Sequence, residues 1–141
     1  MGRSSRPRKK YVPKPNVLPL GIRSSVKFEI PGYQASLALG QDHFCEQHLY
    51  DLLSNADMTR RIAHNGHEIL HAAQEMVYAI AEIQERAQRL GKILVTGDEL
   101  RVLQEGVGRT MDYLRTVSNV QIDRAARAAL KEFDRTGVLR V

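Results

Sequence analysis

The chain has 141 residues, of which 43% are hydrophobic and 26% are charged, and its formal net charge is +5 at pH 7. This length suits one domain, and this composition is typical of a folded globular protein rather than a disordered one. No run of about 18 apolar residues predicts a membrane span, and the N-terminus lacks the apolar stretch of a classical signal peptide. The single cysteine, Cys45, cannot form an internal disulfide. We therefore expect a cytoplasmic protein without a disulfide framework and without membrane contact.

The N-terminal region differs from the rest of the chain in charge and in proline content. Residues 1–27 hold eight basic residues and no acidic one, whereas residues 28–141 hold 13 basic and 16 acidic ones. All five prolines precede residue 32. Because proline fixes φ and lacks an N–H group, residues 1–31 are predicted to form an extended, polyproline-like basic arm. Residues 32–141 are then expected to form one helical domain.

The arm carries the pattern that most directly predicts binding. Several cations along an extended segment can follow an anionic backbone, and an aromatic ring among them can stack on a base. The candidate anion-binding residues are Arg6, Arg8, Lys9, Lys10, Tyr11 and Lys14. The alternative interpretation is a solvated tail that aids solubility or contacts a neighbouring subunit.

The first elements after the charged region are predicted from local patterns. Residues 26–30 alternate enough for one short strand, and Pro31 with Gly32 predicts a turn after it. The period then becomes helical, with one helix over residues 34–54 and Asp57 as a candidate N-cap for a second helix. Along that second helix apolar residues recur at spacings of three and four for about eight turns. Its seam consists of Met58, Ile62, Gly66, Ile69, Ala73, Met76, Ile80, Ile83 and Ala87.

The end of the long helix and the third helix have clear capping signals. Gly91 is predicted to close the long helix, and residues 92–95 to form a short extended piece. Thr96, with Glu99 three residues later, forms a capping-box pattern that starts a third helix.

A fourth helix is expected to begin at Ser118 or Asn119 and to stop at Gly137. Four helices of this kind predict an all-α fold, a small helical bundle of about four helices with the basic arm attached. Shorter helices leave part of the long apolar stripe uncovered, from Met76 to Ile83. We therefore expect a homo-oligomer.

Residues 67–71, His-Glu-Ile-Leu-His, match the HExxH pattern inside the predicted long helix. Imidazoles at i and i+4 of one helical face, here His67 and His71, can share a zinc ion, with Glu68 as general base on a metal-bound water. The metzincin continuation is absent, and no third ligand is evident from the sequence. The favoured interpretation is a polar stripe on a helix surface, with no catalytic residue, metal or cofactor. A zinc-dependent hydrolase is the alternative.

Two further patterns are interpreted as structural. Cys45 lies between His43 and His48, but the spacing places the three on different helical faces and Cys45 on the apolar one, which predicts a buried thiol. The last predicted helix carries basic residues along one side. Arg124, Arg127, Lys131 and Arg135 are expected to pair locally with Asp123, Glu132 and Asp134 rather than to receive phosphates.

Two short motifs resemble those of a group of small proteins encoded by temperate phages and prophages of proteobacteria. They are residues 8–15, Arg-Lys-Lys-Tyr-Val-Pro-Lys-Pro, and residues 96–100, Thr-Gly-Asp-Glu-Leu. Those proteins share a basic Lys-Tyr-x-Pro-Lys-Pro arm, a helical body and a Thr-Gly-x-Glu-Leu helix start followed by a helical hairpin. The similarity is better over residues 86–139 than over the first half of the chain. The resemblance transfers no catalytic residue.

The resemblance implies an accessory protein that works by binding in a bacterial host cytoplasm, in host takeover or in blocking an anti-phage defence. The basic arm adds that the partner is anionic, such as nucleic acid, a nucleotide or a host protein surface. We therefore expect a non-enzymatic, homo-oligomeric binding protein.

Overall fold

The computed structural model describes residues 26–136. Residues 1–25, with all the candidate anion-binding residues of the arm, lie outside this range, as do residues 137–141. Five helices form the described part: α1 (Val26–Ala38), α2 (Glu46–Ile62), α3 (Ile69–Leu90), α4 (Gly97–Thr116) and α5 (Asn119–Thr136). The all-α class is confirmed, with five helices instead of about four and no strand within residues 26–136. None of these five helices is both long and apolar enough to cross a membrane.

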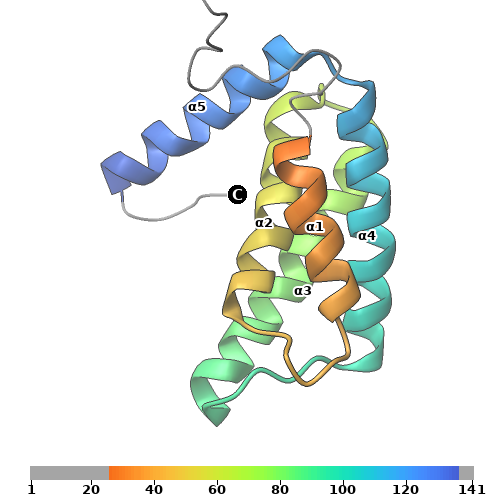
Figure 1. The fold of residues 1–141 in the computed structure, drawn as a ribbon, viewed down its shortest axis with the longest axis vertical. Coiled ribbons are helices and arrows are strands. Elements are labelled where there is room, and N and C mark those ends of the chain that lie inside the picture. Colours follow the sequence, from red (N-terminus) through yellow and green to blue (C-terminus); the bar gives the residue numbers. More distant parts are fainter. Residues whose placement is uncertain (1–25, 137–141) are drawn as a thin grey trace, which may run out of the picture.

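Helices α1 to α4 lie side by side and alternate in direction, whereas α5 turns away from the end of α4 and projects from the bundle (Figure 1). The main core lies among α1 to α4. Its largest fully buried apolar side chains include Leu49, Leu52, Met76, Ile80, Ile83, Leu103 and Val107. A smaller cluster joins α5 to the bundle and contains Met58, Leu114, Ala125 and Ala129. Only part of α5 is therefore held by apolar packing.

The predicted strand over residues 26–30 is wrong, because these residues begin α1. The predicted turn at Pro31 and Gly32 is also wrong, since both residues lie inside the same helix. Gly32 is buried, and a Cβ atom there would lie 2.1 Å from Asn55 Nδ2 of α2. This close approach of two helices outweighs the proline, which removes a single backbone hydrogen bond near the start of α1.

The predicted helix over residues 34–54 is in fact two helices with a turn between them. The turn contains Gly40, whose φ of 79° lies in the left-handed region that favours glycine. Leu39 is buried against the core just before this glycine. The chain then reverses direction, and α2 begins at Glu46. The apolar periodicity continued across the break because both helices bury residues against the same core.

The predicted long helix from Asp57 is wrong in the same way. Asp57 lies within α2, which ends at Ile62, and α3 starts only at Ile69. Gly66 has a φ of 87° and lies in the turn between them. The apolar seam that was predicted for one long helix is therefore shared between α2 and α3.

The apolar stripe from Met76 to Ile83 is covered within the chain. Met76, Ile80 and Ile83 are each 0% or 1% exposed, because α3 packs against both α2 and α4. An uncovered stripe on this helix therefore gives no reason to expect an oligomer.

The predicted end of α3 and the predicted starts of α4 and α5 are confirmed, whereas the predicted stop at Gly137 lies outside the described residues. Gly91 ends α3 in the left-handed conformation, with a φ of 76°. Thr96 caps α4: its hydroxyl accepts the Glu99 N–H at 3.2 Å, and the Glu99 carboxylate accepts the Thr96 N–H at 2.9 Å. Helix α5 begins at Asn119, as predicted. Residues 92–95 form no strand, although Ile93 and Val95 pack against the core.

Candidate functional site

The structure separates the three residues of the HExxH pattern. His67 and Glu68 lie in the turn before α3, and only His71 belongs to the helix. The premise that both imidazoles project from one helical face is therefore wrong. The His71 side chain is 78% exposed, and its Nε2 atom lies 3.7 Å from Glu75 Oε1. Within residues 26–136 no three His, Cys, Asp or Glu side chains gather as a metal-binding group.

His67 has a structural role that its sequence motif did not predict. Its Nδ1 atom accepts a hydrogen bond from the Ile69 N–H at 3.0 Å, which satisfies one of the free N–H groups at the start of α3. Its ring lies edge-on to Tyr113 of α4, with 5.1 Å between ring centroids. His67 is thus a capping and packing residue.

Cys45 is exposed, so the predicted buried thiol is wrong. It precedes α2, and its backbone N–H donates to His48 Nδ1 at 3.0 Å. The Cys45 Sγ atom lies 3.5 Å from the same nitrogen, so the helical spacing did not separate these two side chains. Because the ring nitrogen already accepts a backbone hydrogen bond, the arrangement is a helix start rather than a nucleophile with a free base.

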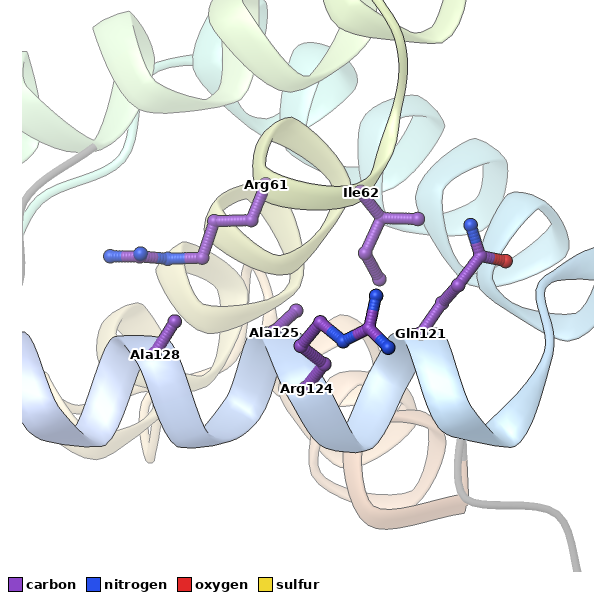
Figure 2. A pocket seen from close by; sticks show the side chains of 6 residues that line it. All are labelled: Arg61, Ile62, Gln121, Arg124, Ala125 and Ala128. Carbon is purple, nitrogen blue, oxygen red and sulfur yellow. The ribbon is translucent and has the colours of Figure 1, made fainter.

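The cations of α2 and α5 meet at a pocket of about 370 Å³. Its lining consists of Arg61, Ile62, Gln121, Arg124, Ala125 and Ala128 (Figure 2). Isoleucine and alanine side chains contribute apolar lining, and the Arg124 guanidinium and the Gln121 amide contribute hydrogen-bond donors. This combination of a small apolar surface with cationic donors suits a flat or phosphorylated anion.

Arg61 is held by carboxylates on two different helices. Its Nε atom donates to Asp57 Oδ2 at 2.8 Å, and its Nη2 atom donates to Glu132 Oε2 at 2.6 Å. Asp57 is 2% exposed, and burial raises the pKa of its carboxyl above the ordinary 3.8, although the hydrogen bond from Arg61 opposes this shift. Arg61 therefore joins α5 to α2, and most of its charge is neutralised inside the protein.

Arg124 is the cation at this pocket that has no partner among the described side chains. Figure 2 shows its guanidinium between Ile62 and Gln121, directed away from that of Arg61. Its side chain is exposed and forms no hydrogen bond or ion pair with any side chain that the structure describes.

Arg127 and Lys131 follow Arg124 at helical spacing and are also exposed. The expected local pairing of these three cations with Asp123 and Glu132 is not found among the described side chains, because Glu132 pairs with Arg61. The side chains of Asp134 and Arg135 lie outside the described residues. We call Arg124, Arg127 and Lys131 the α5 basic face.

The sequence indicated the cations of the α5 basic face but predicted that they pair locally rather than form a binding site, and it did not indicate Arg61 and Gln121 as site residues. The spacing of Asp57 and Arg61 is a helical i, i+4 pair and is visible in the sequence. The contact between Arg61 and Glu132 joins residues 71 positions apart, and no local pattern indicates it.

The fold and this site define a small all-α bundle with a basic surface on its projecting last helix. Comparison of the chain with family models, with curated proteins and with solved structures finds no match. The residues of this chain are therefore the main basis for inferring its function.

Proposed function

We propose that this protein is a non-enzymatic accessory binding protein that engages an anionic partner through its N-terminal arm and the α5 basic face. Nucleic acid is the first partner to test, and a nucleotide or an acidic host protein surface is the alternative. The resemblance to phage and prophage proteins suggests work in a bacterial host cytoplasm, in host takeover or against a defence system.

The observation that carries this proposal is the clustering of three exposed cations, without ion-pair partners among the described side chains, at helical spacing on one face of α5. Arg61, Arg86 and Arg115 are bound by carboxylates of the same chain. The three residues of the α5 basic face have no such partner among the described side chains. Exposed cations without internal partners retain their full capacity to bind phosphates and to release counterions.

The arm carries the net positive charge of the chain. Residues 1–27 hold eight basic residues and no acidic one, whereas the rest of the chain has three more acidic than basic residues. A mildly acidic body repels nucleic acid except where cations cluster, so binding is expected to depend on the arm and on the α5 basic face together. Zinc hydrolysis is not proposed, because no observation of the described residues favours it.

The test measures binding of a 20-nucleotide single strand and of the same sequence as a duplex, by fluorescence anisotropy at several salt concentrations. One variant reverses Arg124, Arg127 and Lys131 to Glu, and another reverses Arg8, Lys9 and Lys10 to Glu. A matched control reverses three exposed cations elsewhere that form no ion pair among the described side chains, Arg89, Lys92 and Arg109. All three variants change the net charge by the same amount.

We expect the first two variants to bind more weakly and to reduce the slope of log K against log salt by about three each, one unit for each lost phosphate contact. The control is expected to keep most of the slope. Equal losses in the control would show that only overall charge matters. No binding of either oligonucleotide at low salt would reject nucleic acid and direct the search to nucleotides and acidic proteins.

A further inference from the structure

One end of the pocket between α2 and α5 is rich in hydrogen-bond donors (Figure 2). Gln121 and Arg124 lie about one turn apart on α5, and both line the pocket. Figure 2 shows the guanidinium of Arg124 and the amide nitrogen of Gln121 beside Ile62 of α2. The guanidinium of Arg61 is directed to the other end of the pocket and is held there by carboxylates. Two donor groups from one helix therefore meet at the end next to Ile62.

A capping box at the start of α5 fixes the orientation of the Gln121 amide. The Gln121 N–H donates to Ser118 Oγ at 3.2 Å, and Gln121 Oε1 accepts from the Ser118 N–H at 3.4 Å and from the Ser118 hydroxyl at 3.2 Å. A backbone N–H can only donate, so the amide atom that faces it is the oxygen. The Nε2 atom is therefore on the other side of the amide, and it has no hydrogen-bond partner among the described side chains.

The side chains that line the pocket offer donors and no free acceptor, because Gln121 Oε1 already accepts two hydrogen bonds. A ligand group at this end of the pocket therefore has to present acceptors. Ile62, Ala125 and Ala128 add apolar surface to the lining. A phosphate group gains nothing from apolar surface, whereas the face of a flat ring does. The two properties together favour a heterocyclic base over a phosphate group.

Guanine is the base whose edge fits these donors. Its O6 and N7 atoms are adjacent acceptors, and one arginine can bind both through two parallel hydrogen bonds. Adenine carries the N6 amino group in place of O6, which would place a donor against the donors of the pocket. A base has to leave its stack before it can enter a pocket, and this costs least in a single strand.

We propose that this pocket binds an unstacked guanine of a single-stranded nucleic acid, with Arg124 donating to O6 and N7 and Gln121 Nε2 donating to O6. A guanidinium has five N–H groups, so the two that bind the base leave others for the adjoining phosphate. Arg127 and Lys131 continue along α5 and contact the phosphates that follow. The inference rests on the proposed binding of nucleic acid and adds a base preference, which phosphate contacts alone do not give.

The first experiment compares three 20-nucleotide thymidine strands in which every fourth base is guanine, adenine or 7-deazaguanine. 7-Deazaguanine keeps O6 and loses only the N7 acceptor. Affinities are measured by fluorescence anisotropy in lithium chloride, so that the strands stay unpaired. We expect the guanine strand to bind about tenfold more tightly than the adenine strand. The 7-deazaguanine strand should bind roughly threefold more weakly than the guanine strand, because one of the two hydrogen bonds to Arg124 is lost.

The outcomes separate this inference from the proposed function. Equal binding of the guanine and adenine strands would overturn the guanine pocket and leave the binding of nucleic acid in place. Equal binding of the guanine and 7-deazaguanine strands would also overturn it, because the base would then not be held through N7. No binding of any strand at low salt would reject both the pocket and the proposed nucleic-acid partner.

The second experiment tests the arginine without changing the charge of the protein. Arg124→Lys keeps a cation but cannot form two parallel hydrogen bonds with one base edge. We expect it to reduce the preference for guanine over adenine to less than about twofold. The matched control is Arg109→Lys, at an exposed position of α4, which should keep the full preference. An undiminished preference in Arg124→Lys would contradict the proposal.

The third experiment exchanges the donor of the amide for an acceptor. Gln121→Glu can still accept the hydrogen bonds from Ser118, so the start of α5 is retained, but a carboxylate oxygen replaces Nε2 and would oppose guanine O6. We expect the preference for guanine to be lost. Gln104→Glu, at an exposed position of α4, adds the same charge and should weaken the binding of both strands equally. A guanine preference that is the same in both variants would show that Gln121 does not contact the base and would overturn its assigned role.

Discussion

Met76 of α3 lies directly against Gly106 of α4, and a Cβ atom at position 106 would lie 2.4 Å from Met76 Cγ. Both residues are fully or nearly fully buried, so the methionine would have to shift within the core to make room for a Cβ atom. The pair explains how α3 and α4 approach closely at this point. A glycine inside a helix usually weakens the helix, but here the absence of a side chain allows α3 and α4 to pack closely.

Gly106→Ala is predicted to destabilise the fold relative to Gly108→Ala. Both substitutions gain the same helix propensity, about 1 kcal/mol, but a Cβ atom at 108 meets nothing within 4 Å. Overpacking at 106 is expected to make that variant less stable than its control by about 1–3 kcal/mol. Urea unfolding of the two variants measures the difference. Equal stabilities would mean that α3 and α4 are not this close in solution.

Removing Arg61 is predicted to be more harmful than removing its neighbour Arg60. Arg61→Met removes the hydrogen bond that the buried carboxylate of Asp57 accepts and the one that links α2 to Glu132 of α5. Loss of one partner of a largely buried pair is expected to cost about 3 kcal/mol. Arg60→Met removes a cation that forms no ion pair with the described side chains, and we expect a change within about 0.5 kcal/mol.

The loss of unfolding free energy caused by Arg61→Met is predicted to become smaller as the pH is lowered. Burial raises the folded-state pKa of Asp57 above its ordinary 3.8, and removal of Arg61 raises it further, since Arg61 lowers it more than Arg60 does. The folded state then binds a proton before the unfolded state does, so lowering the pH stabilises the fold until the carboxyl is protonated in both states. Unfolding free energies of the variant and the parent chain should converge between neutral pH and about pH 4. A constant difference would contradict the assignment to Asp57.

Glu99 is predicted to have the opposite effect, so that its contribution to the unfolding free energy falls as the pH is lowered. Two hydrogen bonds from Arg86, at 2.9 and 2.7 Å, together with the Thr96 N–H, hold the pKa of Glu99 below its ordinary 4.5. The unfolded state therefore takes up the proton first as the pH falls, and this stability is lost through and below the region of pH 4.5.

Glu99→Gln should lower stability at pH 7 and flatten the loss of stability in acid. The comparison is with Glu105→Gln, an exposed position of the same helix. Thermal unfolding followed from pH 7 to pH 3 measures both effects. The idea fails if the two variants have parallel pH profiles.

Pro31→Ala is predicted to stabilise the protein. Pro31 lies inside α1, where it cannot donate a backbone hydrogen bond and where its ring crowds the preceding turn. Alanine restores the donor and has a higher helix propensity, so we expect a gain of up to about 3 kcal/mol. The measurement is the midpoint of urea unfolding, with Gln34→Ala as the control at an exposed position of the same helix. A loss of stability would show that the proline is needed for the start of α1.

Signals that act within one turn of helix were sufficient to locate several elements. Thr96 with Glu99 identified the start of α4, and Gly91 identified the end of α3, because each cap consists of residues close together in the chain. The α5 basic face was visible for the same reason, since its three cations repeat at helical spacing. Their lack of partners among the described side chains was not visible, because Glu132 bonds to Arg61 of another helix.

The all-α class, the C-cap of α3, the N-cap of α4 and the apolar seam that forms the core could be predicted from local patterns. The positions at which that seam breaks depend on packing, because Gly40 and Gly66 interrupt the helices while the residues on both sides still face one core. The tertiary structure also decided that residues 26–32 are helical, through the contact of Gly32 with Asn55 of α2. Local patterns report preferences of a few tenths of a kcal/mol per residue, and packing between distant residues exceeds them.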